Sequence, residues 1–292
     1  MIRSFAFATV DVFTDRRFGG NPLAVVPEAE GLSDAEMQAL AAEFNLSETT
    51  FVLPPRDPAN TARVRIFTPK TELPFAGHPN VGTGWVLASR GLDRDGVLRF
   101  EEAAGLVRVE VERAEQTLVS VRIAAPQPLR LEDGPAPALV APCAGLDAAD
   151  ILGAPLIAST GVAFTFVSVR PDTLTRAAPD LAAFHALAGS DPRLATCNSL
   201  YLYARDGQNI HARLFAPLAG ILEDPATGSA GASLAALLLY LDGGAALEIT
   251  ISQGVEMDRP SLLHASARRE ADGIRAWVGG SCVPVMEGRV SL

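Results

Sequence analysis

The 292-residue chain is 48% hydrophobic and 20% charged, which is typical of a compact globular protein and excludes a disordered one. Its formal net charge of −10 argues against nucleic acid as the partner, because binding to phosphates requires a basic surface. The three cysteines, Cys143, Cys197 and Cys282, are widely spaced. We therefore expect neither a disulfide framework nor a zinc site, and we expect a reducing, cytoplasmic location. Since the N-terminus runs directly into an alternating strand, no signal peptide is expected, and the longest apolar run, residues 230–241, is too short to span a bilayer.

The first half of the chain is predicted to consist mainly of strands. Ser33 and Glu36 have the spacing of a capping box, which predicts a helix that begins there and ends near Phe44. A second helix, built from small residues, is expected to begin at Pro79. Alternating or β-branched segments predict strands at residues 5–13, 23–26, 47–52, 62–67, 107–112 and 119–123.

A proline-rich segment without periodicity, residues 126–142, predicts a linker between two domains. We expect an N-terminal lobe of residues 1–126, completed by the last strand at about 280–292, and a C-terminal lobe of residues 127–279. Helices are predicted in the second lobe at residues 180–187 and 229–241. Strands are predicted at residues 156–160, 163–169, 199–204, 211–215, 247–252, 261–268, 274–278 and 282–290.

An Arg-apolar-Phe-x-Pro pattern occurs at residues 65–69 and again at residues 213–217, about half the chain length later. Each copy is followed by a loop and a helix that begins with tiny residues, near residues 77–84 and 224–231. The free backbone N–H groups at such a helix start can bind an anion. The duplication predicts that one carboxylate or phosphate is held between two similar domains, although two tightly packed helix starts would produce the same pattern.

The second of these helices also indicates the fold class. Residues 230–241 are apolar on every face, so the helix must be buried all round. Many antiparallel strands with one buried helix in each half predict an α+β fold. We expect two pseudo-symmetric domains, each a curled, mostly antiparallel sheet around its central helix, and not a Rossmann alternation.

Three residues are candidates for acid–base chemistry. Glu48 lies at a helix-to-strand corner, where an apolar strand could desolvate its carboxyl group and raise its pKa, although the local sequence alone favours a surface residue. His78 stands at a helix start that would hold it neutral and able to donate a hydrogen bond, and a loop histidine is the alternative. Asp224 precedes the second helix start and fits a second acid or base, an orienting group or a simple cap.

Other motifs in the chain are incomplete. Residues 227–231, Thr-Gly-Ser-Ala-Gly, resemble half of a nucleophile elbow, which leaves a serine hydrolase acting through Ser229 as an alternative. Residues 82–84, Gly-Thr-Gly, lack the rest of a dinucleotide fingerprint, and no Walker A sequence is present. The four histidines have no metal-ligand spacing, so no metal is expected.

Seven short blocks form an ordered set that spans the chain. They are Asp-Val-Phe-Thr (11–14), Gly-Asn-Pro-Leu-Ala-Val-Val (20–26), Leu-Ser-Glu-Thr-Thr-Phe-Val (46–52), Arg-Ile-Phe-Thr-Pro (65–69), Phe-Ala-Gly-His-Pro (75–79), Glu-Asp-Pro-Ala-Thr-Gly-Ser-Ala (223–230) and Ile-Ser-Gln-Gly (251–254). Together they resemble the PhzF-like isomerases of phenazine biosynthesis. The resemblance implies the diaminopimelate-epimerase-like fold, an active site in the cleft between its two halves, and a homodimer. Asp258 stands where this family usually has glycine, and we expect a changed turn there.

The resemblance also implies roles for individual residues. In the related epimerases, paired cysteines at the two helix starts move the proton, whereas small residues occupy those positions here. The family's single glutamate matches Glu48, which is then the group that moves a proton between carbons of the substrate and shifts a double bond. His78 and Asp224 would polarise the polar substituents of the substrate. Such a reaction requires no cofactor or metal.

The implied substrate is a small carboxylate-bearing metabolite, and the substrate named for the family is trans-2,3-dihydro-3-hydroxyanthranilate. An amino-acid or hydroxy-acid epimerase of the same fold is an alternative, with Asp224 as the second acid or base. A metabolite-binding protein without turnover is another. The implied substrate-binding residues are Ser47 beside Glu48, Gly77, Pro79 and Asn80 at the first helix start, and Gly228, Ser229 and Ala230 at the second.

Overall fold

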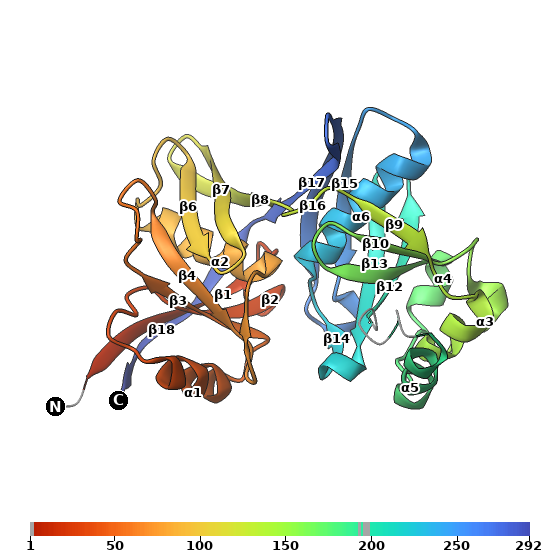
Figure 1. Cartoon of the computed structure of the whole chain (residues 1–292), viewed down its shortest axis with the longest axis horizontal. Helices are drawn as coiled ribbons and strands as arrows, with labels where there is room; N and C mark the ends of the chain where they lie inside the picture. Colours follow the sequence, from red (N-terminus) through yellow and green to blue (C-terminus); the bar gives the residue numbers. More distant parts are fainter. Residues whose placement is uncertain (1–2, 192–193, 195–198) are drawn as a thin grey trace. The chain divides into compact units, whose positions relative to one another are not determined.

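The computed structural model describes residues 3–191, 194 and 199–292 (Figure 1). The chain forms two compact units: unit 1 comprises Met1–Ala124 with Gly279–Leu292, and unit 2 comprises Ala125–Val278. Cys143 and Cys282 are free and buried. The third cysteine of the sequence, Cys197, lies outside the described residues.

Unit 1 is a sheet with two helices. Antiparallel pairs join β1 to β18 and to β2, β3 to β4, β4 to β5, β6 to β7 and β7 to β8. Parallel pairs join β2 to β3 and β4 to β6. The strands are β1 (Ser4–Val12), β2 (Asn21–Val26), β3 (Glu48–Leu53), β4 (Ala62–Phe67), β5 (Glu72–Leu73), β6 (Val97–Glu102), β7 (Gly105–Ala114), β8 (Thr117–Ala124) and β18 (Cys282–Ser291), and the helices are α1 (Asp34–Phe44) and α2 (Gly77–Ser89).

The described part of unit 2 contains the remaining strands and the helices α3 to α6. Its strands are β9 (Arg130–Asp133), β10 (Leu156–Ser159), β11 (Ala163–Ser168), β12 (Leu200–Asp206), β13 (Asn209–Ala216), β14 (Ile221–Asp224), β15 (Ala246–Gln253), β16 (Ser261–Glu270) and β17 (Gly273–Gly280). Its helices are α3 (Pro137–Val140), α4 (Pro171–Leu174), α5 (Leu181–Ser190) and α6 (Gly228–Asp242).

The strand pairing of unit 1 recurs in unit 2. The antiparallel pair β1–β2, the parallel pair β2–β3 and the antiparallel pair β3–β4 correspond to β10–β11, β11–β12 and β12–β13. The parallel pair β4–β6 and the antiparallel pair β6–β7 correspond to β13–β15 and β15–β16. β18 flanks β1 as β9 flanks β10. The two units are therefore copies of one topology, and the predicted α+β class is confirmed.

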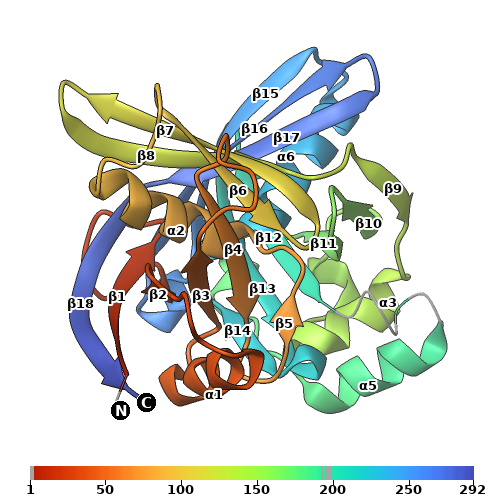
Figure 2. The ribbon, with the colours of Figure 1, turned by 60° about the vertical axis from the view of Figure 1, so that its left-hand side comes forward.

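Each sheet wraps around one central helix. Strands β1, β2, β3, β7 and β8 contact α2, and β10, β11, β15 and β16 contact α6 (Figures 1 and 2). Every residue of α2 from Gly77 to Ala88 is buried. Glycine lets the strands approach this closely, because a Cβ atom at Gly82 would lie 2.6 Å from Leu23 Cδ2 and one at Gly84 would lie 2.7 Å from Val109 Cγ1. The predicted burial of both helices is confirmed except at the end of α6, where Tyr240 and Leu241 are exposed.

The repeated Arg-apolar-Phe pattern has the same physical basis in both units. Arg65 on β4 pairs with Glu72 on β5 and lies 5.0 Å from the ring centre of Phe67. Arg213 on β13 pairs with Glu223 on β14 and lies 4.9 Å from the ring centre of Phe215. In each hairpin a cation that bonds the next strand also stacks on an aromatic ring of its own strand.

Several local predictions can be compared with the structure. The capping box of Ser33 and Glu36 is present at the start of α1, as predicted. Asp258 has a φ of +57°, the left-handed conformation that glycine adopts most easily, so the departure at this position falls in a turn. The proline-rich segment, which was predicted as a linker, contains β9 and α3, and β6 was not predicted at all.

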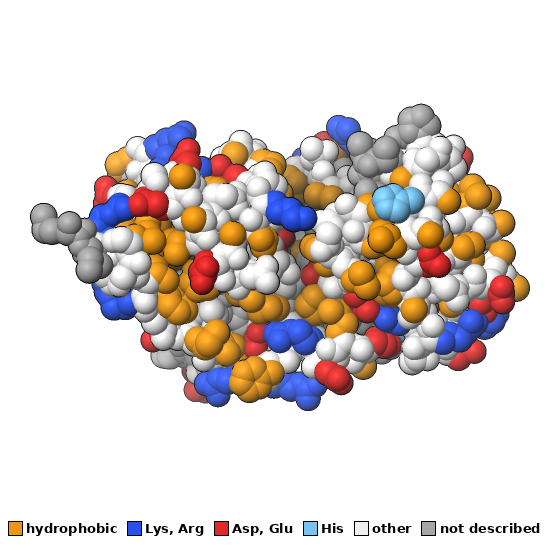
Figure 3. All heavy atoms as spheres, turned by 90° about the horizontal axis from the view of Figure 1, so that it is seen from below, with side chains coloured by type: hydrophobic (Ala, Val, Ile, Leu, Met, Phe, Trp, Pro, Cys, Tyr) orange, Lys and Arg blue, Asp and Glu red, His pale blue; other side chains and the backbone are white. Residues whose placement is uncertain are grey.

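Charged side chains of both signs are distributed over the surface. On the face shown in Figure 3, basic and acidic side chains are interspersed. Exposed or half-exposed ion pairs such as Arg122–Glu110 and Arg205–Asp242 neutralise part of the charge locally. None of the helices in the described residues is long and apolar enough to cross a membrane.

The two arginines of the repeat are expected to differ in their effect on stability. Arg213→Met leaves the half-buried Glu223 and the carbonyls of Leu174 and Ala177 without their donor, so we expect the free energy of unfolding to fall by about 3–5 kcal/mol. Arg65→Met is the matched control, and a loss of about 1 kcal/mol is expected because its partners are more exposed. Urea unfolding of both variants measures the difference, and equal losses would contradict it.

Candidate active site

Glu48 and His78 meet at the start of the central helix of unit 1. Glu48 is the first residue of β3, and His78 is the second residue of α2. His78 Nδ1 lies 3.4 Å from Glu48 Oε2, and the side chains are 7% and 14% exposed. The predicted desolvation of the Glu48 side chain is therefore present, and local sequence was wrong to favour a surface residue.

Burial determines the charge of His78. It lowers the pKa of the imidazole to about 3, and a hydrogen bond with the backbone of Pro22 opposes this only in part. The ring is therefore neutral at pH 7, as the sequence predicted. The main cause is loss of solvent, whereas the sequence argument had named the helix end.

The first turn of α2 is buried and has no side-chain cap. Its N-cap residue, Ala76, has an extended backbone and offers no side-chain acceptor. Gly77, Pro79 and Asn80 are all buried, and Ser47, which directly precedes β3, is half-buried. Because proline has no N–H group, the free donors of this turn come from its other residues.

Asp224 belongs to a hydrogen-bond network at the start of α6 in unit 2. Thr227 Oγ1 donates to Asp224 Oδ2 over 2.6 Å. Gln253 Nε2 donates to the Asp224 carbonyl at 2.8 Å and to Thr227 Oγ1 at 3.0 Å. The Tyr201 hydroxyl donates to Gln253 Oε1 at 3.1 Å. Because Gln253 is fully buried, the network fixes the position of the Asp224 carboxyl group.

The first turn of α6 resembles that of α2. The hydroxyl of its N-cap residue, Thr227, bonds Asp224 and does not cap the helix. Gly228 and Ala230 are buried, and Ser229 is half-buried. The predicted residues thus fall into one group in each unit: Ser47, Glu48, Gly77, His78, Pro79 and Asn80 in unit 1, and Asp224, Gly228, Ser229 and Ala230 in unit 2.

Sequence reasoning missed three polar residues near these helix starts. Gln253 and Tyr201 complete the network around Asp224, and Glu102, at the end of β6, is a carboxyl group close to Asn80. The alternation of apolar and polar residues along β6 could have identified Glu102, because Glu102 lies on the same face of the strand as the buried residues Leu98 and Phe100.

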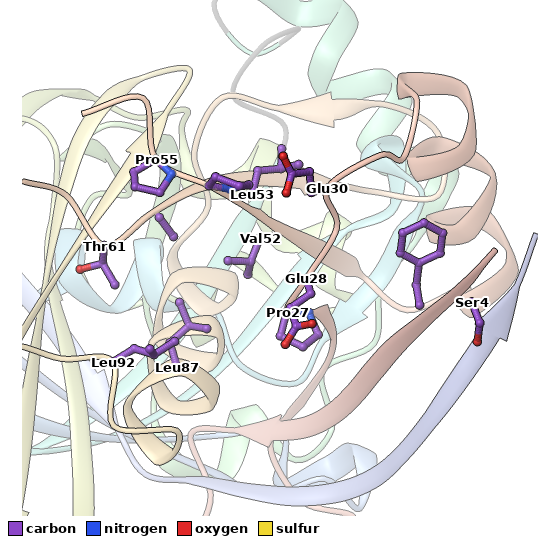
Figure 4. Close-up of a pocket in the computed structure, with 13 residues that line it drawn as sticks. Ser4, Pro27, Glu28, Glu30, Val52, Leu53, Pro55, Thr61, Leu87 and Leu92 are labelled. Carbon is purple, nitrogen blue, oxygen red and sulfur yellow. The ribbon is translucent and has the colours of Figure 1, made fainter. Parts of the chain in front are cut away.

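A separate pocket in unit 1 lies away from this group (Figure 4). It has a volume of about 480 Å³, and its lining includes Val52 at the end of β3 and Leu87 near the end of α2. Leu87 is nine residues after His78, or roughly 14 Å along the helix. The lining carboxylates, Glu28 and Glu30, would repel an anionic ligand. Among the described residues, no group of three His, Cys, Asp or Glu side chains could hold a metal ion.

Comparison with known proteins assigns the chain to a family. Residues 10–288 match the family model described as phenazine biosynthesis-like protein. A phenazine biosynthesis protein of the PhzF family from Bacillus anthracis has the same fold, with a TM-score of 0.88, 25% identity and 99% of each chain covered. The chain belongs to this phenazine biosynthesis-like, or PhzF, family.

Its relatives indicate the type of enzyme. The chain is 38% identical to an uncharacterised isomerase of Mesorhizobium japonicum, over 97% of each chain. It is 34% identical to a trans-2,3-dihydro-3-hydroxyanthranilate isomerase of Pseudomonas chlororaphis, over 98% of this chain and 99% of the relative. The protein is an isomerase of the PhzF family.

The buried, neutral His78 predicts a specific loss of stability in acid. Its folded pKa of about 3 lies below the ordinary value of 6.5, so the contribution to stability is complete above pH 6.5 and is lost as the pH falls towards 3. Between pH 7 and 5, we expect the wild type to lose about 2 kcal/mol more unfolding free energy than His78→Gln. Urea titrations at the two pH values test this, and parallel losses in both proteins would show that His78 is not the titrating group.

Proposed function

We propose that this isomerase acts on a small carboxylate-bearing metabolite and that Glu48 moves a proton between two of its carbon atoms. The observation that carries the proposal is the Glu48 carboxyl group, largely shielded from solvent and 3.4 Å from a neutral His78 at an uncapped helix start. The relative from Pseudomonas chlororaphis, an isomerase of trans-2,3-dihydro-3-hydroxyanthranilate, supports this compound as the first substrate to test.

The neutral charge of His78 suits a carboxyl group that must both accept and release a proton. A cationic imidazolium at this distance would stabilise the Glu48 carboxylate and oppose its protonation. The neutral ring contributes a hydrogen-bonding partner without that charge. Glu48 can then change its protonation state during each catalytic cycle.

The reaction is balanced without an external reagent. The Glu48 carboxylate takes a proton from a carbon of the substrate, and the electron pair of the broken C–H bond forms a new double bond. The original double bond shifts, and Glu48 returns the proton to the carbon that gains electron density. Bonds and hydrogens are conserved, so the product is an isomer.

The uncapped first turn of α2 supplies a binding site for the carboxylate of the substrate. The backbone N–H groups of Gly77 and His78 have no partner further back in the helix, and the helix dipole favours an anion there. Binding at this turn would hold the substrate beside Glu48, which approaches the same turn through His78. No cofactor or metal is required in this scheme.

Unit 2 is proposed to contribute a second set of polar contacts. Asp224, fixed by Thr227 and Gln253, would orient an amine or hydroxyl of the substrate. The first turn of α6, from Gly228 to Ala230, would bind a further polar group with the Ser229 hydroxyl. We also propose that the protein is cytoplasmic and that it forms a homodimer. Sedimentation analysis of the purified protein can test the homodimer.

Glu48→Gln tests the proton transfer directly. The amide has nearly the same shape but cannot accept the proton, so we expect kcat to fall at least 10²-fold while the melting temperature stays within a few degrees. NMR in D₂O would follow double-bond migration and deuterium uptake in trans-2,3-dihydro-3-hydroxyanthranilate and in a panel of cyclic and amino-acid carboxylates. Glu43→Gln, the same change at an exposed position of α1, is the control.

Other outcomes of the NMR experiment, and a separate labelling experiment, would support the alternative functions. Deuterium uptake at a stereocentre without migration of a double bond indicates an epimerase or racemase. Carboxylates that bind and return unchanged indicate a binding protein. Labelling of Ser229 by a phosphonate probe indicates a hydrolase. Wild-type turnover by Glu48→Gln would overturn the proposed mechanism.

Asp224→Asn distinguishes an orienting group from a second acid or base. Asparagine can still accept the hydrogen bond from Thr227, so we expect the fold to be retained and KM to rise more than kcat falls. A loss of about 10²-fold or more in kcat with an unchanged KM would instead indicate direct proton transfer by Asp224. Steady-state kinetics of the variant beside the wild type gives both constants.

A further inference from the structure

Glu102 is a half-buried residue of unit 1 whose carboxyl oxygens are shielded from solvent. It follows Leu98 and Phe100 on the helix-facing side of β6, and both of those side chains are fully buried. Its two carboxyl oxygens are buried and have no hydrogen-bond partner among the described residues. The nearby Asn80, which is fully buried, donates from Nδ2 to the Ala76 carbonyl at 3.1 Å, while its Oδ1 is buried without a partner. Two unsatisfied polar groups therefore adjoin the first turn of α2.

The strand pairing identifies the counterpart of Glu102 in unit 2. Phe100 on β6 lies opposite Ala62, five residues before Phe67 of the repeated pattern. Ile251 on β15 lies opposite Ile210, five residues before Phe215. Two residues after each of these positions come Glu102 and Gln253, the last residues of their strands.

Gln253 shows what this position does. Its amide bonds the Asp224 carbonyl and Thr227 and accepts from Tyr201, and so it holds the segment that leads into α6. An ionised carboxylate could not donate in this way, whereas a protonated carboxyl group has one donor and one acceptor, as the end of a glutamine side chain does.

We propose that Glu102 acts as a neutral carboxylic acid that positions the first turn of α2, in the role that Gln253 has at α6. We assign Asn80 Oδ1, which is buried without another partner, as the acceptor of its O–H group, and Asn80 Nδ2 in turn donates to the carbonyl of the N-cap residue Ala76. The part of this inference that concerns binding of the substrate carboxylate at the turn rests on the proposed function. Ionisation of Glu102 would then remove the donor and place a negative charge beside the anion.

The surroundings of Glu102 favour the neutral form. Burial raises the pKa of its carboxyl group to about 8, and the interaction with Asn80 opposes the increase only in part. The charged groups on neighbouring elements are Arg63 on β4, which lies across the ladder from Glu101, and Glu48 beside the neutral His78 at the α2 turn. Glu101 itself accepts backbone N–H groups of Arg56 and Asp57, and on β7 the residue opposite Glu102 is Gly105.

Ligand-free stability tests the neutral acid independently of any activity. Below pH 4.5 Glu102 is protonated in both the folded and unfolded states, and between about 4.5 and 8 only the folded state keeps the proton, so stability falls as the pH rises through this range. Glu102→Gln keeps a neutral side chain at every pH. We expect its melting temperature to exceed that of the wild type by an amount that grows from pH 5 to pH 9.

Substrate binding tests the consequence for the α2 turn. If only the protonated form binds the carboxylate, KM of the wild type rises about tenfold between pH 7 and pH 9, while KM of Glu102→Gln stays flat. Glu101→Gln, which changes the neighbouring carboxyl group, should keep the wild-type pH profile.

The proposal is overturned if Glu102→Gln and the wild type show the same pH dependence of melting and KM. Should Glu102→Gln fail to fold, the ¹³C carboxyl resonance of Glu102 in the wild type decides the question, and a midpoint near 4.5 rejects the proposal. Failure of the proposed function would be recognised separately, because Glu48→Gln would then turn over fully. The ligand-free melting result would not be affected by that outcome.

Discussion

In each unit one apolar helix packs inside its sheet and is buried along most of its length, and this packing constrains the rest of the structure. A helix without a polar face can be stable in water only if a sheet wraps around it, and the strands can approach closely only where the helix carries small residues such as Gly82 and Gly84. Burial then creates a second requirement, because the N–H groups of the first turn have lost solvent as a partner. Neither α2 nor α6 meets this requirement with a side-chain cap.

The two units hold their helix starts with different chemistry on the same topology. In unit 2 a neutral network of Gln253, Tyr201 and Thr227 surrounds Asp224. In unit 1 titratable groups lie near the start of α2, where Glu48 Oε2 is 3.4 Å from His78 Nδ1 and Glu102 interacts with Asn80. Burial raises the pKa of the Glu102 carboxyl group to about 8 and lowers that of the His78 imidazole to about 3.

Features that depend on residues close together in the sequence were predicted correctly, whereas features that join distant segments were missed. The capping box at Ser33, the central helices and the strands that carry the repeated Arg-apolar-Phe pattern were predicted, because each depends on residues a few positions apart. β6 was missed, since its short alternation ends in two glutamates and its parallel pairing with β4 joins distant segments. The resemblance to the PhzF family pointed to Glu48, whereas local sequence favoured an exposed corner there, and periodicity alone carries no information about which strand lies beside it.

Residue periodicity, small-residue helices and ordered motifs are local properties of the chain, and they were sufficient to identify a duplicated α+β protein of the PhzF family. Which polar groups lose water and which find partners became visible only in the folded chain. The neutral state of His78, its distance from Glu48 and the isolation of the Glu102 carboxyl oxygens all arise where strands and a helix from separate parts of the sequence meet. Desolvation depends on every neighbour in space, and a linear pattern does not contain those neighbours.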